Sequence, residues 1–158
     1  MISLINNYNT DNAHFNANDK INGKAGGVVV TKGKNNLGTI SHELFHAYQD
    51  DEGQGGRSIH NEVEAMLFQA SVVCENKWEK GAIPLCSLIG DNKEYNIIID
   101  ALLSGYSSDN MDKAIKGFQE YSGANRGGVY NSNYPPRRGD NQSRDLIEDF
   151  YPLQPWKK

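Results

Sequence analysis

The chain has 158 residues, a formal net charge of -4 and a mean hydropathy of -0.67. These values suit one folded domain, residues 1–158, with polar loops rather than a disordered segment. Lys and Arg form no cluster of the kind that nucleic-acid binding requires, and no run approaches the ~20 apolar residues of a membrane span. The first residues lack the charged and apolar regions of a secretory signal, so we expect a soluble protein, secreted or delivered, if at all, as part of a longer chain.

The N-terminal third is predicted to form short strands and turns. Residues 1–24 are rich in Asn and turn-like, with a short strand at 2–5. The β-branched run GGVVVT at 26–31 lies between glycines and a Lys-Gly pair, which predicts a second strand. An exposed edge at this second strand would let an extended peptide pair with it, and a purely structural strand is the equal alternative.

A helix is predicted for residues 37–50, with different side chains on its two sides. Four apolar residues share one face at about 100° per residue, which predicts a core-facing stripe: Leu37, Ile40, Leu44 and Tyr48. His42 and His46 lie on the opposite side, about 40° apart, with Glu43 beside them. One face of this helix would therefore pack and the other would present two imidazoles and a carboxylate.

The rest of the chain is predicted to be mainly helical. A second helix spans 58–80, with Ser58 as a suitable N-cap and an apolar stripe that follows from Ile59. Helices are also expected at 111–121 and 143–150, and a long loop at 122–142. Residues 91–104 can form a strand or a short helix, and the helix is preferred. Cys74 and Cys86 are compatible with one disulfide or with two reduced, buried thiols. The predicted fold class is α+β: a mainly helical domain with a small β-sheet and a central helix at 37–50.

The segment His42-Glu43-Leu44-Phe45-His46 has the HExxH spacing of a zinc site. Two His at i and i+4 of a helix point the same way and can bind one Zn²⁺ ion together. The ion lowers the pKa of a bound water towards ~7, and a nearby carboxylate takes its proton. We therefore expect His42 and His46 to be metal ligands and Glu43 to be the catalytic base.

The third metal ligand is sought on the second helix, among His60, Glu62 and Glu64. Measured from Ile59, Glu62 lies about 60° away, at the edge of the apolar stripe, and Glu64 about 140° away, which predicts that it faces outward. His60, about 100° away in the first turn, is the weaker competitor. Helical phase thus favours Glu62.

The segments HELFHAYQ and NEVEAMLFQA resemble the zincin metallopeptidases of the gluzincin type. They look in particular like the HELxHAY-type peptidase domains of bacterial Rhs-like toxins and type III effectors. The resemblance covers roughly residues 26–75 and implies that Glu62, which opens the E-x-E-A segment, is the third ligand. It departs from the NExxSD pattern of thermolysin-like enzymes, because Met66 stands where that pattern has Asp.

The function expected from these residues is peptide-bond hydrolysis by a zinc-dependent peptidase, and the resemblance implies a bacterial effector or toxin domain. Such enzymes polarise the scissile carbonyl with a further side chain, for which Tyr130 and Tyr134 are candidates. The expected partners are a protein or peptide substrate and, for a toxin, an immunity or inhibitor protein, with the chain a monomer. The alternatives are a regulatory intracellular peptidase and a catalytically inactive zincin-like module that binds other proteins.

Overall fold

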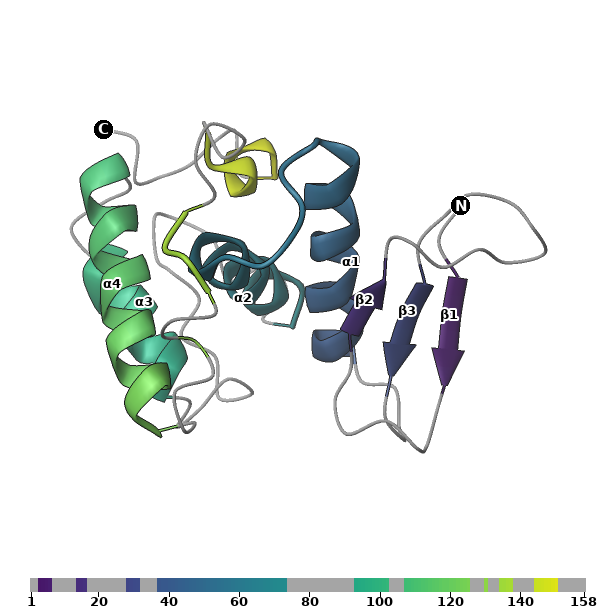
Figure 1. Ribbon diagram of the computed structural model, residues 1–158, viewed down its shortest axis with the longest axis horizontal. Coiled ribbons are helices and arrows are strands. Elements are labelled where there is room, and N and C mark those ends of the chain that lie inside the picture. The colour runs from purple at the N-terminus through teal and green to yellow at the C-terminus, as the bar shows by residue number, and fades with distance from the viewer. Residues whose placement is uncertain are drawn as a thin grey trace.

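The computed structural model describes residues 3–6, 14–16, 28–31, 37–73, 93–102, 107–125, 130, 134–137 and 144–150. Helices account for most of these residues, and three short strands form a small sheet at one side of the molecule (Figure 1). Helix α1 (Leu37–Asp51) stands between this sheet and the other helices (Figure 1), in contact with two of the strands and with the next helix. The prediction of a mainly helical α+β chain is thereby confirmed in its coarse form.

The sheet has the order β1-β3-β2, so its last strand in sequence lies in the centre. Strand β1 (Ser3–Asn6) runs parallel to β3 (Val28–Thr31), and β2 (His14–Asn16) runs antiparallel to β3. The strands predicted at 2–5 and 26–31 are confirmed with slightly different bounds. The prediction that 26–31 offers an exposed edge is wrong, because both sides of β3 are paired.

Strand β2 lies within the segment that the sequence predicted to be turn-like, and this prediction needs correction. Its three residues, His-Phe-Asn, lack the β-branched run that would have indicated a strand. Tertiary pairing explains it instead, since Phe15 lies opposite Val29 in the antiparallel ladder.

The loop between α1 and α2 is folded back tightly against the end of α1. Gly53 has a φ of 74°, a conformation that favours glycine, and the N–H of Gln54 donates to the carbonyl of Gln49 at 2.8 Å. A Cβ atom added at Gly55 would lie 2.6 Å from Oδ1 of Asp50, so only glycine fits there without displacement. Asn61 completes the loop by donating from Nδ2 to the carbonyls of Gln54 and Gly56.

Helix α2 (Ile59–Val73) begins where the N-cap predicts, because the backbone N–H of Asn61 donates to Oγ of Ser58 at 3.1 Å. The first two N–H groups of the helix find acceptors far along the chain. Ile59 donates to the carbonyl of Pro135 at 2.9 Å and His60 to that of Pro136 at 3.0 Å. Residues 74–80 of the predicted helix, and both cysteines, lie outside the described residues.

The remaining helices are α3 (Lys93–Leu102), α4 (Ser108–Asn125) and the 3-10 helix η3 (Leu146–Asp149). The predicted helix at 91–104 matches α3 closely. Helix α4 is longer than the predicted 111–121 and extends into the segment expected to be a loop. The short helix predicted at 143–150 is present as η3, in the tighter 3-10 form.

The hydrophobic core lies between α1, α2, α3, α4 and η3. Its fully buried large apolar side chains come from all five elements: Phe45, Ile59, Ile98, Met111, Phe118 and Leu146. The predicted apolar face of α1 is wrong in part, because Leu37 is 57% exposed and Leu44 is 41% exposed, whereas Phe45 is 1% exposed. Helix α1 packs against the sheet and against α2, so its buried face differs from the apolar stripe predicted from the sequence.

Phe45 anchors α1 to the rest of the helical part. Its ring lies 5.1 Å from that of Phe68 on α2 and 5.6 Å from that of Phe150 after η3, measured between centroids.

Among the described residues, no helix combines the length and the apolar character needed to cross a lipid bilayer.

Candidate metal centre

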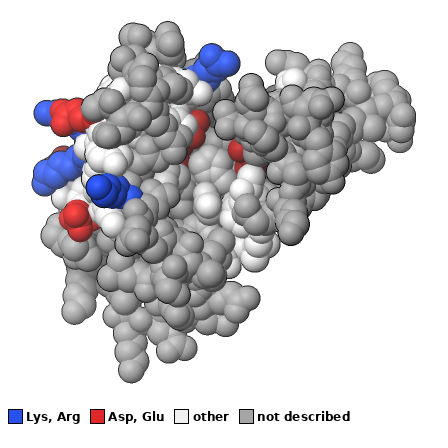
Figure 2. Space-filling view, turned by 90° about the horizontal axis from the view of Figure 1, so that it is seen from below, with Lys and Arg blue, Asp and Glu red and all other residues white. Residues whose placement is uncertain are grey.

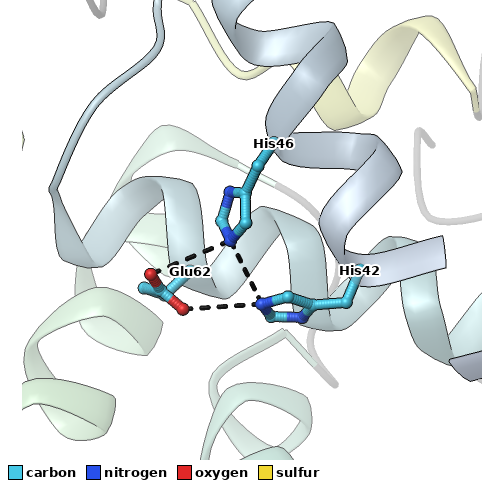
Figure 3. Close-up of side chains that lie close together, drawn as sticks. All are labelled: His42, His46 and Glu62. Atoms are coloured by element: carbon cyan, nitrogen blue, oxygen red, sulfur yellow. Dashed lines mark hydrogen bonds and ion pairs between the residues drawn. The ribbon is translucent and has the colours of Figure 1, made fainter. Parts of the chain in front are cut away.

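Three side chains predicted as metal ligands lie together where α1 passes α2. His42 and His46 come from successive turns of α1, and Glu62 from the first turn of α2 (Figure 3). The two Nε2 atoms are 3.1 Å apart. The Glu62 carboxylate points at both rings, with Oε2 3.5 Å from Nε2 of His42 and Oε1 3.8 Å from Nε2 of His46 (Figure 3).

These separations match the requirements of a zinc ion. Ligand atoms about 2.0–2.1 Å from a tetrahedral zinc are about 3.3 Å from one another, and the three observed separations of 3.1, 3.5 and 3.8 Å lie around that value. Two imidazole nitrogens and one carboxylate, with side chains 17–19% exposed, also form a typical donor set for a catalytic zinc that retains solvent access. The residues present therefore fit Zn²⁺.

The pKa of His42 reflects the negative charge of this centre. Burial alone lowers the pKa of His42, but the hydrogen bond to Glu62, the charges of Glu62 and Glu43 and a hydrogen bond to Gln69 outweigh it, so the pKa lies above its ordinary value. A site that attracts a proton between an imidazole and two carboxylates also attracts a metal cation, which competes with that proton.

Glu43, the predicted catalytic base, is 7% exposed and belongs to the same turn of α1 as His42. Its negative charge contributes to the raised pKa values of both His42 and Tyr134. Glu43 therefore lies within electrostatic reach of the three-ligand cluster without being one of its three members.

Tyr134 is the tyrosine that the structure brings to this centre. Burial raises the pKa of Tyr134, the charges of Glu62 and Glu43 raise it further, and Arg57 partly offsets them. The backbone carbonyl of Tyr134 accepts a hydrogen bond from Nε2 of Gln119 at 3.2 Å. Tyr130 supports the Tyr134 ring edge to face, with centroids 4.8 Å apart, and packs on the core beside Phe118.

The other two candidates for third ligand, His60 and Glu64, belong to a separate buried cluster. Both are 0% exposed, so the prediction that Glu64 faces outward is wrong. Nε2 of His60 lies 2.7 Å from Oδ1 of Asp145, which also accepts from Nη1 of Arg137 at 3.0 Å. Hydrogen bonds thus connect the side chains of this second cluster.

Glu64 connects this network with the candidate metal centre. Its Oε1 accepts from the backbone N–H of Ile147 at 2.9 Å, and its Oε2 accepts from Nε2 of Gln49 at 2.9 Å. Oε1 of Gln49 in turn lies 2.8 Å from Nδ1 of His46. Burial raises the pKa of Glu64, and His60, Ile147 and Gln49 partly offset that effect.

Sequence reasoning missed Gln49, although its position offered an indication. Gln49 follows His46 by three residues, so one helical turn places its amide beside that imidazole. Gln49 is 0% exposed, and its Nε2 also donates to the carbonyl of Asn61 at 3.2 Å.

The molecular surface is hollowed on the face seen from below, and acidic side chains lie on the walls of this hollow (Figure 2). The Lys and Arg side chains visible on the same face lie away from the hollow, on the outer surface (Figure 2).

Comparison of the chain with protein-family models, with curated proteins and with solved structures finds no match. The functional conclusion therefore depends on the residues of this chain and their geometry.

Proposed function

We propose that the chain is a zinc-dependent peptidase in which His42, His46 and Glu62 hold the metal and Glu43 is the general base. The observation that carries this proposal is the convergence of the three side chains at 3.1–3.8 Å from two different helices. A chance occurrence of the HExxH spacing on a surface helix would not explain why a carboxylate from another helix points at both imidazoles.

The residues of the chain take distinct roles in the proposed hydrolysis. A bound zinc ion would supply a Lewis acid that acidifies water and polarises the scissile carbonyl. Glu43 takes the proton of the attacking water and then gives it to the leaving amine. Tyr134 donates a hydrogen bond to the oxygen on which negative charge develops, and burial and the neighbouring carboxylates keep its phenol protonated at neutral pH.

The finer assignment follows the sequence resemblance over residues 26–75. It identifies a zincin-like peptidase of the gluzincin type that acts on a protein or peptide and serves as a bacterial toxin or effector domain. The negative charges of Glu62 and Glu43 at the centre favour a substrate with positive charge near the cleaved bond. An immunity or inhibitor protein that covers the proposed centre belongs to the same proposal.

Metal content and hydrolysis, measured on the same variants, test the proposal. Wild-type protein should bind close to one zinc per chain by mass spectrometry, and His46→Ala and Glu62→Ala should lose it. Glu43→Gln should retain zinc and lose cleavage of a dye-labelled, unfolded protein substrate. Glu120→Gln is the matched control, because Glu120 has a 69% exposed side chain on α4 and should change neither property.

Each deviation has a definite meaning. Failure of the wild type to bind supplied zinc would refute the metal centre. Zinc binding without cleavage by the wild type would favour the alternative, an inactive zincin-like module that binds other proteins. Unchanged cleavage by Glu43→Gln would refute the assignment of the base.

A further inference from the structure

We propose that Gln49 and Glu64 are positioning residues that fix the tautomer of His46, so that its Nε2 lone pair is available to the metal. This inference rests on the proposed function, because it concerns a ligand of the proposed zinc centre. It assigns a role to two buried polar side chains that the proposed hydrolysis does not otherwise use.

The tautomer follows from the donors and acceptors around Gln49. Its amide nitrogen donates two hydrogen bonds, to the carbonyl of Asn61 at 3.2 Å and to Oε2 of Glu64 at 2.9 Å. Both protons of that nitrogen are thereby used, and the amide oxygen is the atom that faces Nδ1 of His46 at 2.8 Å. Because an amide oxygen only accepts, Nδ1 must carry the proton, and neutral His46 then has its lone pair on Nε2.

Glu64 and the carbonyl of Asn61 together determine which way round the Gln49 amide lies, because both accept from its nitrogen. Both oxygens of Glu64 accept N–H hydrogen bonds, from Gln49 and from the backbone of Ile147. A carboxylate can accept at both positions, so the side of Gln49 that faces it must be the nitrogen. Hydrogen bonds are therefore donated in order from His46 to Gln49 and from Gln49 to Glu64.

This order makes Glu64→Gln an informative substitution, because it keeps the size of the side chain. The oxygen of a glutamine at position 64 would be needed by the N–H of Ile147, so its NH₂ group would face Gln49. The Gln49 amide would then turn over to present its oxygen, giving up its bond to the Asn61 carbonyl, and its NH₂ group would face Nδ1 of His46. His46 would become the Nε2–H tautomer, which cannot bind a metal through Nε2.

The experiment measures the tautomer and the zinc affinity separately. Nitrogen-15 NMR of the metal-free protein should show the Nδ1–H form of His46 in the wild type and the Nε2–H form in Glu64→Gln. Zinc titration against a chromogenic chelator should show about 10–100-fold weaker binding in Glu64→Gln, the range for losing a partner behind a metal ligand. Glu120→Gln, on the exposed surface of α4, should match the wild type in both measurements.

The double variant Gln49→Glu with Glu64→Gln provides a rescue. Glu at position 49 accepts from Nδ1–H of His46 and from the new amide at position 64, so the wild-type tautomer and most of the zinc affinity should return. The bond to Asn61, the longest of those around Gln49 at 3.2 Å, is the only one of these that the exchange sacrifices.

The two proposals fail in different ways. An unchanged tautomer in Glu64→Gln, or a double variant that binds zinc no better than Glu64→Gln, would overturn the positioning role. A tautomer change in a protein whose wild type binds no zinc would support the positioning of His46 and refute the metal centre itself.

Discussion

Replacement of Phe45 by Ala, compared with Leu44→Ala, tests which face of α1 meets the core. A buried aromatic side chain removes about 150–250 Å² from water, which at about 25 cal/mol per Å² gives ~4–6 kcal/mol as an upper estimate. A compact unfolded state reduces this to ~3–5 kcal/mol, the range found for Phe→Ala in cores. Phe45 is 1% exposed and packs against three other aromatic rings, so it should reach that range.

Leu44, the neighbouring residue, is 41% exposed and should lose about 1 kcal/mol on truncation, since only part of its surface is buried. Urea denaturation followed by circular dichroism gives both changes in the free energy of unfolding. A loss of ~3–5 kcal/mol is a large share of the roughly 5–15 kcal/mol that stabilises a typical domain. Equal losses for the two variants, or a larger loss for Leu44→Ala, would refute the packing described for α1.

Two further predictions concern tyrosines. Tyr134→Phe should retain zinc and reduce peptide cleavage by about 10²–10³-fold, the effect of removing one oxyanion donor. The control Tyr130→Phe should leave cleavage unchanged. Equal effects of the two substitutions on cleavage would refute the catalytic role of Tyr134. The hydrogen bond from Tyr48 to Asp149, 2.5 Å long, raises the pKa of Tyr48 to about 12, so its contribution to stability is present below the ordinary value of 10.0 and is lost as the pH rises through about 12. Ultraviolet titration should therefore show that Tyr48→Phe lacks a phenol that titrates near pH 12, and the loss of one that titrates near 10 would contradict this bond.

The sequence predicted those features of the fold that depend on a single helical turn or on one short β-branched segment. The i, i+4 spacing of His42 and His46 depends only on helical geometry, and Ser58 marks the start of α2 through a contact within its own first turn. Strand β3 was indicated by its β-branched run. Strand β2 was not, because its pairing partner lies outside the segment and its own residues carry no strand preference.

The candidate site was predictable only as far as one helix face could be defined. Helical phase measured from a single apolar stripe predicted that Glu62 faces α1, which agrees with the structure. The same measurement predicted that Glu64 faces solvent, which is wrong. That method assumes one buried face, whereas α2 is in contact with α1, α3, α4 and η3 and buries side chains around its circumference. The partners of Glu64 lie 15 and 83 residues away, so no local pattern shows them.

The paired carbonyls of Pro135 and Pro136 have a consequence for the order in which the protein is made. They accept the first N–H groups of α2, the helix that carries Glu62, and Glu64 on the same helix is bonded to Ile147. A ribosome would therefore release the three proposed ligands well before the segments that hold α2, the helix of Glu62, in place. At about 5–20 residues per second the nascent chain would pass several seconds with an incomplete centre. The proposed activity would then arise only after residues 135–147 have emerged and bonded to α2.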